Sequence, residues 1–131
     1  METLYHFTSL FHWARMEMLQ NCLVPTGSLY PINLLWLTSS PIPEGMGLDG
    51  MLEEFDKRNI RITVRKRAYM YEWNIWCIAR RADENLKEAL IVSAGAEDTH
   101  KTWYVSEREV PFKDILLVEN IKTGEVLYKK Q

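Results

Sequence analysis

Leu4-Tyr5-His6-Phe7-Thr8 and Leu34-Leu35-Trp36-Leu37-Thr38 are the two runs that indicate most about the architecture of this chain. The first run is short, aromatic and built from residues that favour strands. The second is an uninterrupted apolar run, which is typical of a central strand that is buried on both faces. We therefore expect two strands of one sheet here.

The segment between these two runs predicts a helix over residues 10–21. Thr8 or Ser9 can cap its start, because a side-chain hydroxyl accepts a hydrogen bond from a free backbone N–H. Pro25-Thr26-Gly27 then has the composition of a turn. The helix is expected to carry one mostly apolar stripe, made of Leu10, Trp13, Ala14, Glu17 or Met18, and Asn21.

The rest of the chain mixes further strands and helices without a regular alternation. In the run 59–65, Ile60, Ile62 and Val64 alternate with polar residues and are expected to face the core. This mixture favours a single α+β domain over residues 1–131 rather than a doubly wound sheet. Further strands are expected at 103–106, 115–119 and 125–128, helices at 49–58 and in two parts over 70–92, and a loop at 39–47.

Composition and cysteine usage restrict the class of protein. The chain has 131 residues, of which 47% are hydrophobic, as in ordinary globular domains. It contains no run of about 18 apolar residues and begins without a signal-peptide pattern, so we expect no membrane association. Cys22 and Cys77 lie far apart, and no His or Cys cluster has metal-ligand spacing. Free thiols, a cytoplasmic location and no bound metal are therefore expected.

The charges are unevenly distributed along the chain, although the net charge is only −2. Residues 60–81 contain six basic groups and one acidic group. Such a segment can contact a phosphate-bearing ligand or a polynucleotide, or it can simply be a solvated strand end. The sequence leaves both interpretations open.

Two pairs of polar residues are candidates for a functional site. His6 and Thr8 project from the same face of the first strand, and a histidine there can bond a ribose hydroxyl or exchange a proton near neutral pH. Glu107 and Glu109 follow the expected strand 103–106. Two carboxylates at a strand end can stabilise a developing cation, although each pair also has an ordinary structural explanation.

The pattern made by His6-Phe7-Thr8, a following helix, Leu23-Val24-Pro25-Thr26-Gly27 and Leu35-Trp36-Leu37-Thr38-Ser39-Ser40 resembles the front half of ADP-ribosyltransferase-like domains. The later Glu107-x-Glu109-Val110-Pro111-Phe112 is similar to the Glu-x-Glu turn of some members. The resemblance implies a mixed, mostly antiparallel split sheet with flanking helices. One position departs from the family: members with a His-Tyr-Glu set carry a tyrosine where this chain has Trp36.

The resemblance also implies a ligand and a role for each candidate. NAD would be the substrate, with Glu109 and Glu107 as the catalytic carboxylates and a protein or nucleic acid as the acceptor of ADP-ribose. A related nucleotide bound without turnover is the other form of this hypothesis. Its nucleotide-binding residues would be His6, Thr8, Trp36, Thr38 and Ser39, with Arg61 among the arginines that meet the diphosphate.

Two other functions stay open on the sequence. His6-Phe7-Thr8 and His100-Lys101-Thr102 are two His-x-Thr elements, the pattern of phosphoesterases that use paired histidines as acid and base. A non-enzymatic binding or inhibitory protein also fits the small size and the many aromatic residues, of which five are tryptophans. Such a small domain would also suit a protein encoded by a phage.

Overall fold

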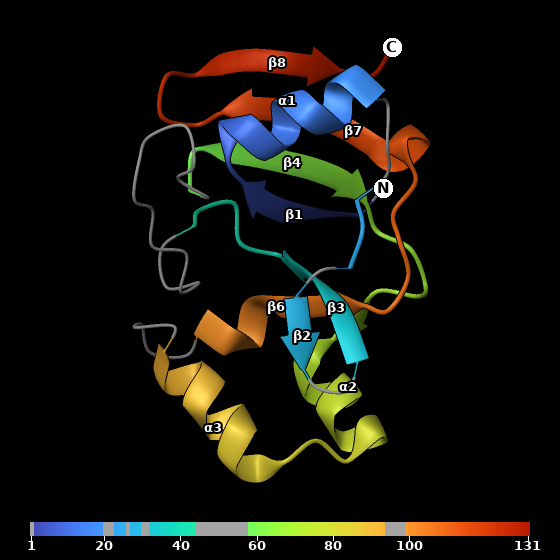
Figure 1. Cartoon of the computed structure of the whole chain (residues 1–131), viewed down its shortest axis with the longest axis vertical. Coiled ribbons are helices and arrows are strands. Elements are labelled where there is room, and N and C mark those ends of the chain that lie inside the picture. Colours follow the sequence, from blue (N-terminus) through green and yellow to red (C-terminus); the bar gives the residue numbers. More distant parts are fainter. Residues whose placement is uncertain (1, 20–22, 26, 30–31, 44–57, 94–98) are drawn as a thin grey trace.

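The computed structural model describes residues 2–19, 23–25, 27–29, 32–43, 58–93 and 99–131 (Figure 1). Its helices are α1 (Leu10–Leu19), α2 (Trp73–Arg80) and α3 (Glu84–Ser93), with the short 3-10 helices η2 (Thr99–Thr102) and η3 (Phe112–Asp114). Its strands are β1 (Thr3–Thr8), β2 (Gly27–Leu29), β3 (Ile32–Thr38), β4 (Ile60–Arg65), β5 (Tyr71–Glu72), β6 (Trp103–Ser106), β7 (Ile115–Asn120) and β8 (Glu125–Lys129).

The strands form one sheet, and every pairing among the described residues is antiparallel. The order across the sheet is β5-β6-β3-β1-β4-β7-β8, with β2 paired to β3 off this path. The expected mixed α+β class and the mostly antiparallel sheet are thereby confirmed. The buried run Leu34–Thr38 lies at the centre of the sheet, between β1 and β6, as its composition predicts.

The sheet divides into two halves that meet between β1 and β3. One residue pair, Tyr5 with Thr38, joins these strands, whereas β1 pairs with β4 along its whole length. On one side of the junction lie β4, β7 and β8, and on the other side lie β6 and β5 (Figure 1). The ladder between β1 and β3 is therefore much shorter than the ladders on either side of it.

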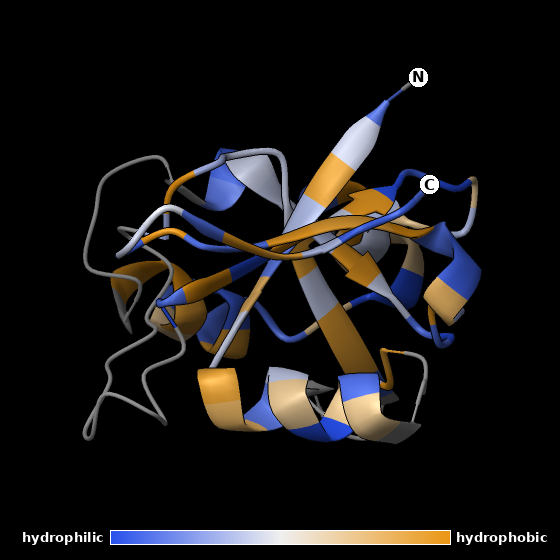
Figure 2. Ribbon diagram, turned by 90° about the horizontal axis from the view of Figure 1, so that it is seen from above, coloured by the Kyte–Doolittle hydropathy of each residue, from blue (hydrophilic) through white to orange (hydrophobic). Residues whose placement is uncertain are grey.

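Two hydrophobic cores pack against the sheet. In the first, Trp13 of α1 packs with Leu4, Ile62, Val118 and their neighbours, and this core extends across the junction to β3. In the second, Trp73 and Trp76 of α2 pack with Leu34, Trp103 and Val105. Figure 2 shows the hydrophobic residues concentrated on the strands between the helices. The predicted alternation of Ile60, Ile62 and Val64 is confirmed, since all three are fully buried.

The start of α1 follows the sequence, but its predicted stripe does not. The Ser9 hydroxyl accepts a hydrogen bond from His12 N (3.2 Å), so Ser9 is the cap. Leu10 and Met18 are 40% and 77% exposed, which makes the stripe prediction wrong at both positions. The helix contacts the sheet along a narrower line through Trp13 and, in part, Met16.

The helical region 70–92 forms in two parts, as predicted. Arg81 adopts a left-handed conformation (φ 53°) that ends α2, and Asp83 Oδ1 accepts hydrogen bonds from the first backbone N–H groups of α3. Gly27, expected in a turn, instead begins β2 and pairs with Leu34. The helix expected at 49–58 lies almost wholly outside the described residues. None of the described helices has the length and apolar character needed to cross a membrane.

Candidate functional site

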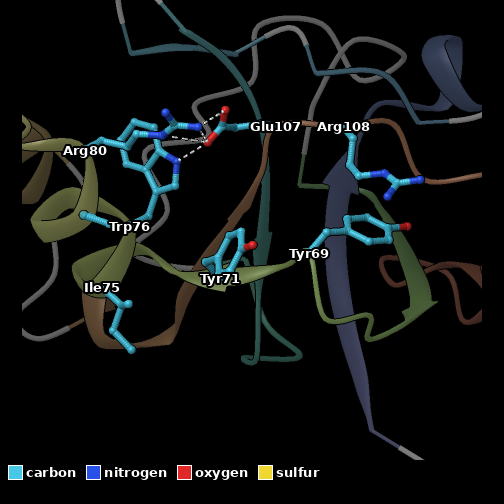
Figure 3. Close-up of a pocket in the computed structure, with 8 residues that line it drawn as sticks. Tyr69, Tyr71, Ile75, Trp76, Arg80, Glu107 and Arg108 are labelled. Atoms are coloured by element: carbon cyan, nitrogen blue, oxygen red, sulfur yellow. Dashed lines mark hydrogen bonds and ion pairs between the residues drawn. The ribbon is translucent and has the colours of Figure 1, made fainter.

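A groove of about 610 Å³ opens beside α2, at the end of the sheet where β6 finishes (Figure 3). Figure 3 shows Trp76, Arg80 and Glu107 on one side, Tyr69 and Arg108 on the other, and Tyr71 between them. The groove is lined by Tyr69, Tyr71, Ile75, Trp76, Ala79, Arg80, Glu107 and Arg108. It thus combines aromatic rings, two guanidinium groups and one carboxylate.

Glu107 is held in the groove by two side chains of α2. Its Oε2 accepts hydrogen bonds from Trp76 Nε1 (2.9 Å) and from Arg80 Nε (3.0 Å), and its Oε1 accepts one from Arg80 Nη2 (2.6 Å). Trp76 and Arg80 are four residues apart on α2, so they share one face of the helix. The alternation of β6, in which Trp103 and Val105 face α2, also points Glu107 toward that helix.

These contacts keep Glu107 ionised and leave it room for a ligand. The hydrogen bond from Arg80, followed by that from Trp76, lowers the pKa of the Glu107 carboxyl below its ordinary value. Oε2 accepts from Trp76 and from both Nε and Nη2 of Arg80, whereas Oε1 accepts only from Arg80 among the described residues. Since each carboxylate oxygen has two lone pairs, Oε1 can accept one more hydrogen bond.

On the opposite side of the groove, the cation of Arg108 lies over the aromatic ring of Tyr69. The guanidinium carbon of Arg108 lies 4.4 Å from the centre of the Tyr69 ring. The backbone of Arg108 is fixed by buried Ser106, whose Oγ donates to Arg108 O (2.6 Å) and accepts from Arg108 N (3.2 Å). The Tyr69 hydroxyl is buried and has no hydrogen-bond partner among the described residues, and this burial raises its pKa.

His6 and Thr8 lie on the other face of the sheet from this groove. Tyr5 is directly opposite Thr38, so these two side chains share a face, and His6, the next residue, projects from the reverse face toward the core of α1. His6 Nδ1 donates a hydrogen bond to Trp36 O (2.9 Å) across the junction of the two halves. The His6 side chain therefore bonds the backbone carbonyl of Trp36, and the structure does not bring His6 to Glu107.

Trp36, Thr38 and Ser39 connect β3 to the segment before β6. The Trp36 ring packs against Trp73 and Trp103, at centroid distances of 6.1 and 5.8 Å. Thr38 Oγ1 donates to Thr102 Oγ1 (2.9 Å), and Ser39 N donates to Thr102 O (2.9 Å). These contacts join β3 to α2 and to the segment that leads into β6. None of the three predicted residues lines the groove.

The basic residues around Arg61 are paired with nearby carboxylates. Arg61 Nη2 lies 2.8 Å from Glu119 Oε1, and Nη1 donates to Pro41 O. Arg65 and Arg67 both pair with Asp114, at 3.9 and 2.7 Å, and Lys66 pairs with Glu2 at 3.0 Å. The structure thus favours a structural use of these residues over the expected contact with a diphosphate.

Of the eight residues predicted for the site, only Glu107 lines the groove. Glu109 is exposed and stands outside the described lining. His100 lies on η2, not on a strand, with its ring against Trp73 and Trp103. Sequence reasoning missed Tyr69, Tyr71, Trp76, Arg80 and Arg108, and only the proximity of Arg108 to Glu107 in the chain gave a signal. Within the described ranges, no three His, Cys, Asp or Glu side chains are grouped to hold a metal ion.

Comparison of the chain with protein-family models and with curated proteins gives no match in either case. The groove and its contacts are therefore the basis for a functional conclusion.

Proposed function

We propose that the protein is an ADP-ribosyltransferase-like domain that binds NAD, or a nucleotide related to it, in the groove at Glu107. The position of Glu107 carries this proposal. It is the one carboxylate in the lining, it is held in its ionised form by Arg80 and Trp76, and its Oε1 accepts from Arg80 alone among the described residues. A ribose hydroxyl is a suitable donor for the further hydrogen bond that this oxygen can accept.

The shape and lining of the groove fit a nucleotide in other respects. Tyr71 and Trp76 present aromatic surface on which a nicotinamide or adenine ring can stack. A volume of about 610 Å³ falls in the range of pockets that hold drug-sized ligands. The division of the sheet at Tyr5 and Thr38 also supports the resemblance to a split sheet.

A fixed carboxylate suits the chemistry of ADP-ribosyl transfer. When the bond between nicotinamide and ribose breaks, nicotinamide leaves with the electron pair, and positive charge develops on the ribose. An oxygen or nitrogen atom of the acceptor, or the oxygen of a water molecule, then bonds to the ribose carbon and loses a proton. A carboxylate beside the ribose interacts more strongly with this charge than with the neutral ribose of the ground state, so Glu107 would lower the barrier.

The test compares wild type with Glu107→Gln and Glu109→Gln. We expect NAD to raise the melting temperature of wild type and of Glu109→Gln, because Glu109 stands outside the described lining of the groove. Where free nicotinamide is released, Glu107→Gln should slow the release by roughly 100-fold or more, while Glu109→Gln should not. If wild type shows neither a thermal shift nor nicotinamide release, the proposal is wrong.

A binding protein without enzymatic activity is a second candidate, and the surface of α2 favours it. Ile75 and Ile78, three residues apart on α2, are 55% and 74% exposed, and Tyr71, which lines the groove with Ile75, is 48% exposed. Apolar side chains gathered at the edge of a groove are typical of a surface that contacts another macromolecule. Absence of any nucleotide effect on wild type, in the experiment above, would favour this candidate.

A further inference from the structure

Arg108 differs from the other arginine of the groove in what its guanidinium contacts. Arg80 is satisfied by Glu107, with a closest N–O distance of 2.6 Å. Arg108 lies over the Tyr69 ring, and no carboxylate among the described residues pairs with it. With two arginines and one glutamate, the lining has a formal net charge of +1. The cation at Arg108 is therefore the one that is available to an anionic ligand.

The surroundings of Arg108 also fix its orientation before any ligand arrives. The Tyr69 ring lies against the guanidinium, 4.4 Å from its central carbon, and supports it from one side. Ser106 is fully buried and bonds both the backbone N–H and the carbonyl of Arg108. Because the side chain and the backbone are both held, little conformational freedom remains to be lost when a ligand binds.

We propose that Arg108 is the phosphate-binding residue of this groove, and that its ligand is a phosphate-bearing nucleotide and not a free nucleoside or base. A guanidinium presents two parallel N–H groups to a phosphate, and charge-assisted bonds of this kind are among the strongest in proteins. The phosphate then lies on the Tyr69 side of the groove, and the ribose lies toward Glu107 on the other side (Figure 3). This assignment rests on the proposed function and adds the class of ligand to it.

The experiment measures the affinity of two ligands that differ only in a phosphate, nicotinamide mononucleotide and nicotinamide riboside, by calorimetry. We expect wild type to bind the mononucleotide roughly 10- to 100-fold more tightly, which is the contribution of hydrogen bonds to a charged group. Arg108→Ala should lose this preference while its affinity for the riboside stays unchanged. Arg108→Lys should keep only part of it, because an ammonium neither stacks nor bonds bidentately.

Arg15→Ala is the matched control. Arg15 also lies over an aromatic ring, that of Phe11 at 5.9 Å, but it is on α1, far from the groove lining in the chain. This variant removes the same charge and should keep the wild-type preference for the phosphate. Far-ultraviolet circular dichroism and thermal melting confirm that each variant is folded.

The outcomes separate the two proposals. If wild type binds both ligands equally, or if a folded Arg108→Ala keeps the preference, the role of Arg108 is overturned and nucleotide binding stands. If wild type binds neither of these ligands nor NAD, the proposed function falls, and the assignment of Arg108 falls with it.

Discussion

Asp114 offers the sharpest test of how the charged residues of this protein support its fold. It lies in η3 with 5% of its side chain exposed, and it accepts hydrogen bonds from Arg67 Nε (3.1 Å) and Nη2 (2.7 Å). Arg65 adds an ion pair at 3.9 Å. Asp114→Asn keeps the shape of the side chain but removes its charge and turns an acceptor toward Arg67 into a donor.

The expected loss of stability follows from these contacts. Hydrogen bonds to charged groups contribute about 1.5–3 kcal/mol when they are buried. Because the Arg67 side chain is 42% exposed, water replaces part of the lost interaction, and we expect a loss of about 1–2 kcal/mol for Asp114→Asn. For a domain of this size that corresponds to a fall of roughly 3–10 °C in the melting temperature.

The pH dependence of this effect has a definite sign. The hydrogen bond from Arg67 lowers the pKa of Asp114 in the folded protein, whereas an unfolded aspartate titrates near 3.9. The ionised carboxylate therefore stabilises the fold above the unfolded pKa, and this contribution is lost as the pH falls through the folded pKa. Wild type and Asp114→Asn should differ at neutral pH and converge in acid.

Urea denaturation followed by tryptophan fluorescence, at pH 7 and at a series of acidic values, measures both effects. Glu2→Gln is the control, because Glu2 is paired with Lys66 but is 77% exposed, and it should leave the denaturation midpoint unchanged. If Asp114→Asn is as stable as wild type at pH 7, or if a difference persists unchanged in strong acid, the role given to this carboxylate is wrong.

Three further changes have expected outcomes that standard measurements can check. Ser9→Ala removes the cap that accepts a hydrogen bond from His12 N and should destabilise the protein by about 1 kcal/mol in urea denaturation, while Ser9→Thr should retain most of the stability. Gly124→Ala should lower the stability measured by thermal melting by about 1 kcal/mol, because the residue has a φ of 82°, which an alanine adopts only with strain. No described atom lies within 4 Å of the added carbon, so a clash adds nothing to this loss. Trp76→Phe keeps an aromatic ring but loses the hydrogen bond to Glu107, so the pKa of Glu107 should rise toward its ordinary value in a carboxyl NMR titration.

The strands that local patterns predict are the elements that the structure confirms most fully. Ile60, Ile62 and Val64 alternate with polar residues because one face of their strand packs on the core. The apolar run at 34–38 arises because both faces of its strand are covered. The stripe of α1 was mispredicted because contact with the sheet, and not the apolar character of Leu10 or Met18, decides which helix face is buried. Helical period alone does not define that contact.

The candidate site was harder to predict because it depends on pairing between distant segments. The resemblance implies that Arg61 meets a diphosphate, yet β4 and β7 pair in a register that places Glu119 directly opposite Arg61. Glu107 can be predicted from the sequence because it directly follows the expected strand at 103–106. Its partners Trp76 and Arg80 come from a helix that packs against β6, and no spacing in the sequence links them to Glu107.

The most direct test of nucleotide binding at Glu107 uses the indole N–H signals of the five tryptophans during a titration with NAD. Trp76→Phe and Trp13→Phe assign two of these signals by their absence. The Trp76 signal should move with NAD and reach saturation, because its N–H bonds Glu107 in the groove. The Trp13 signal should stay in place, since this ring packs in the other core. A titration in which no indole signal moves, or in which Trp13 moves and Trp76 does not, would contradict the proposal.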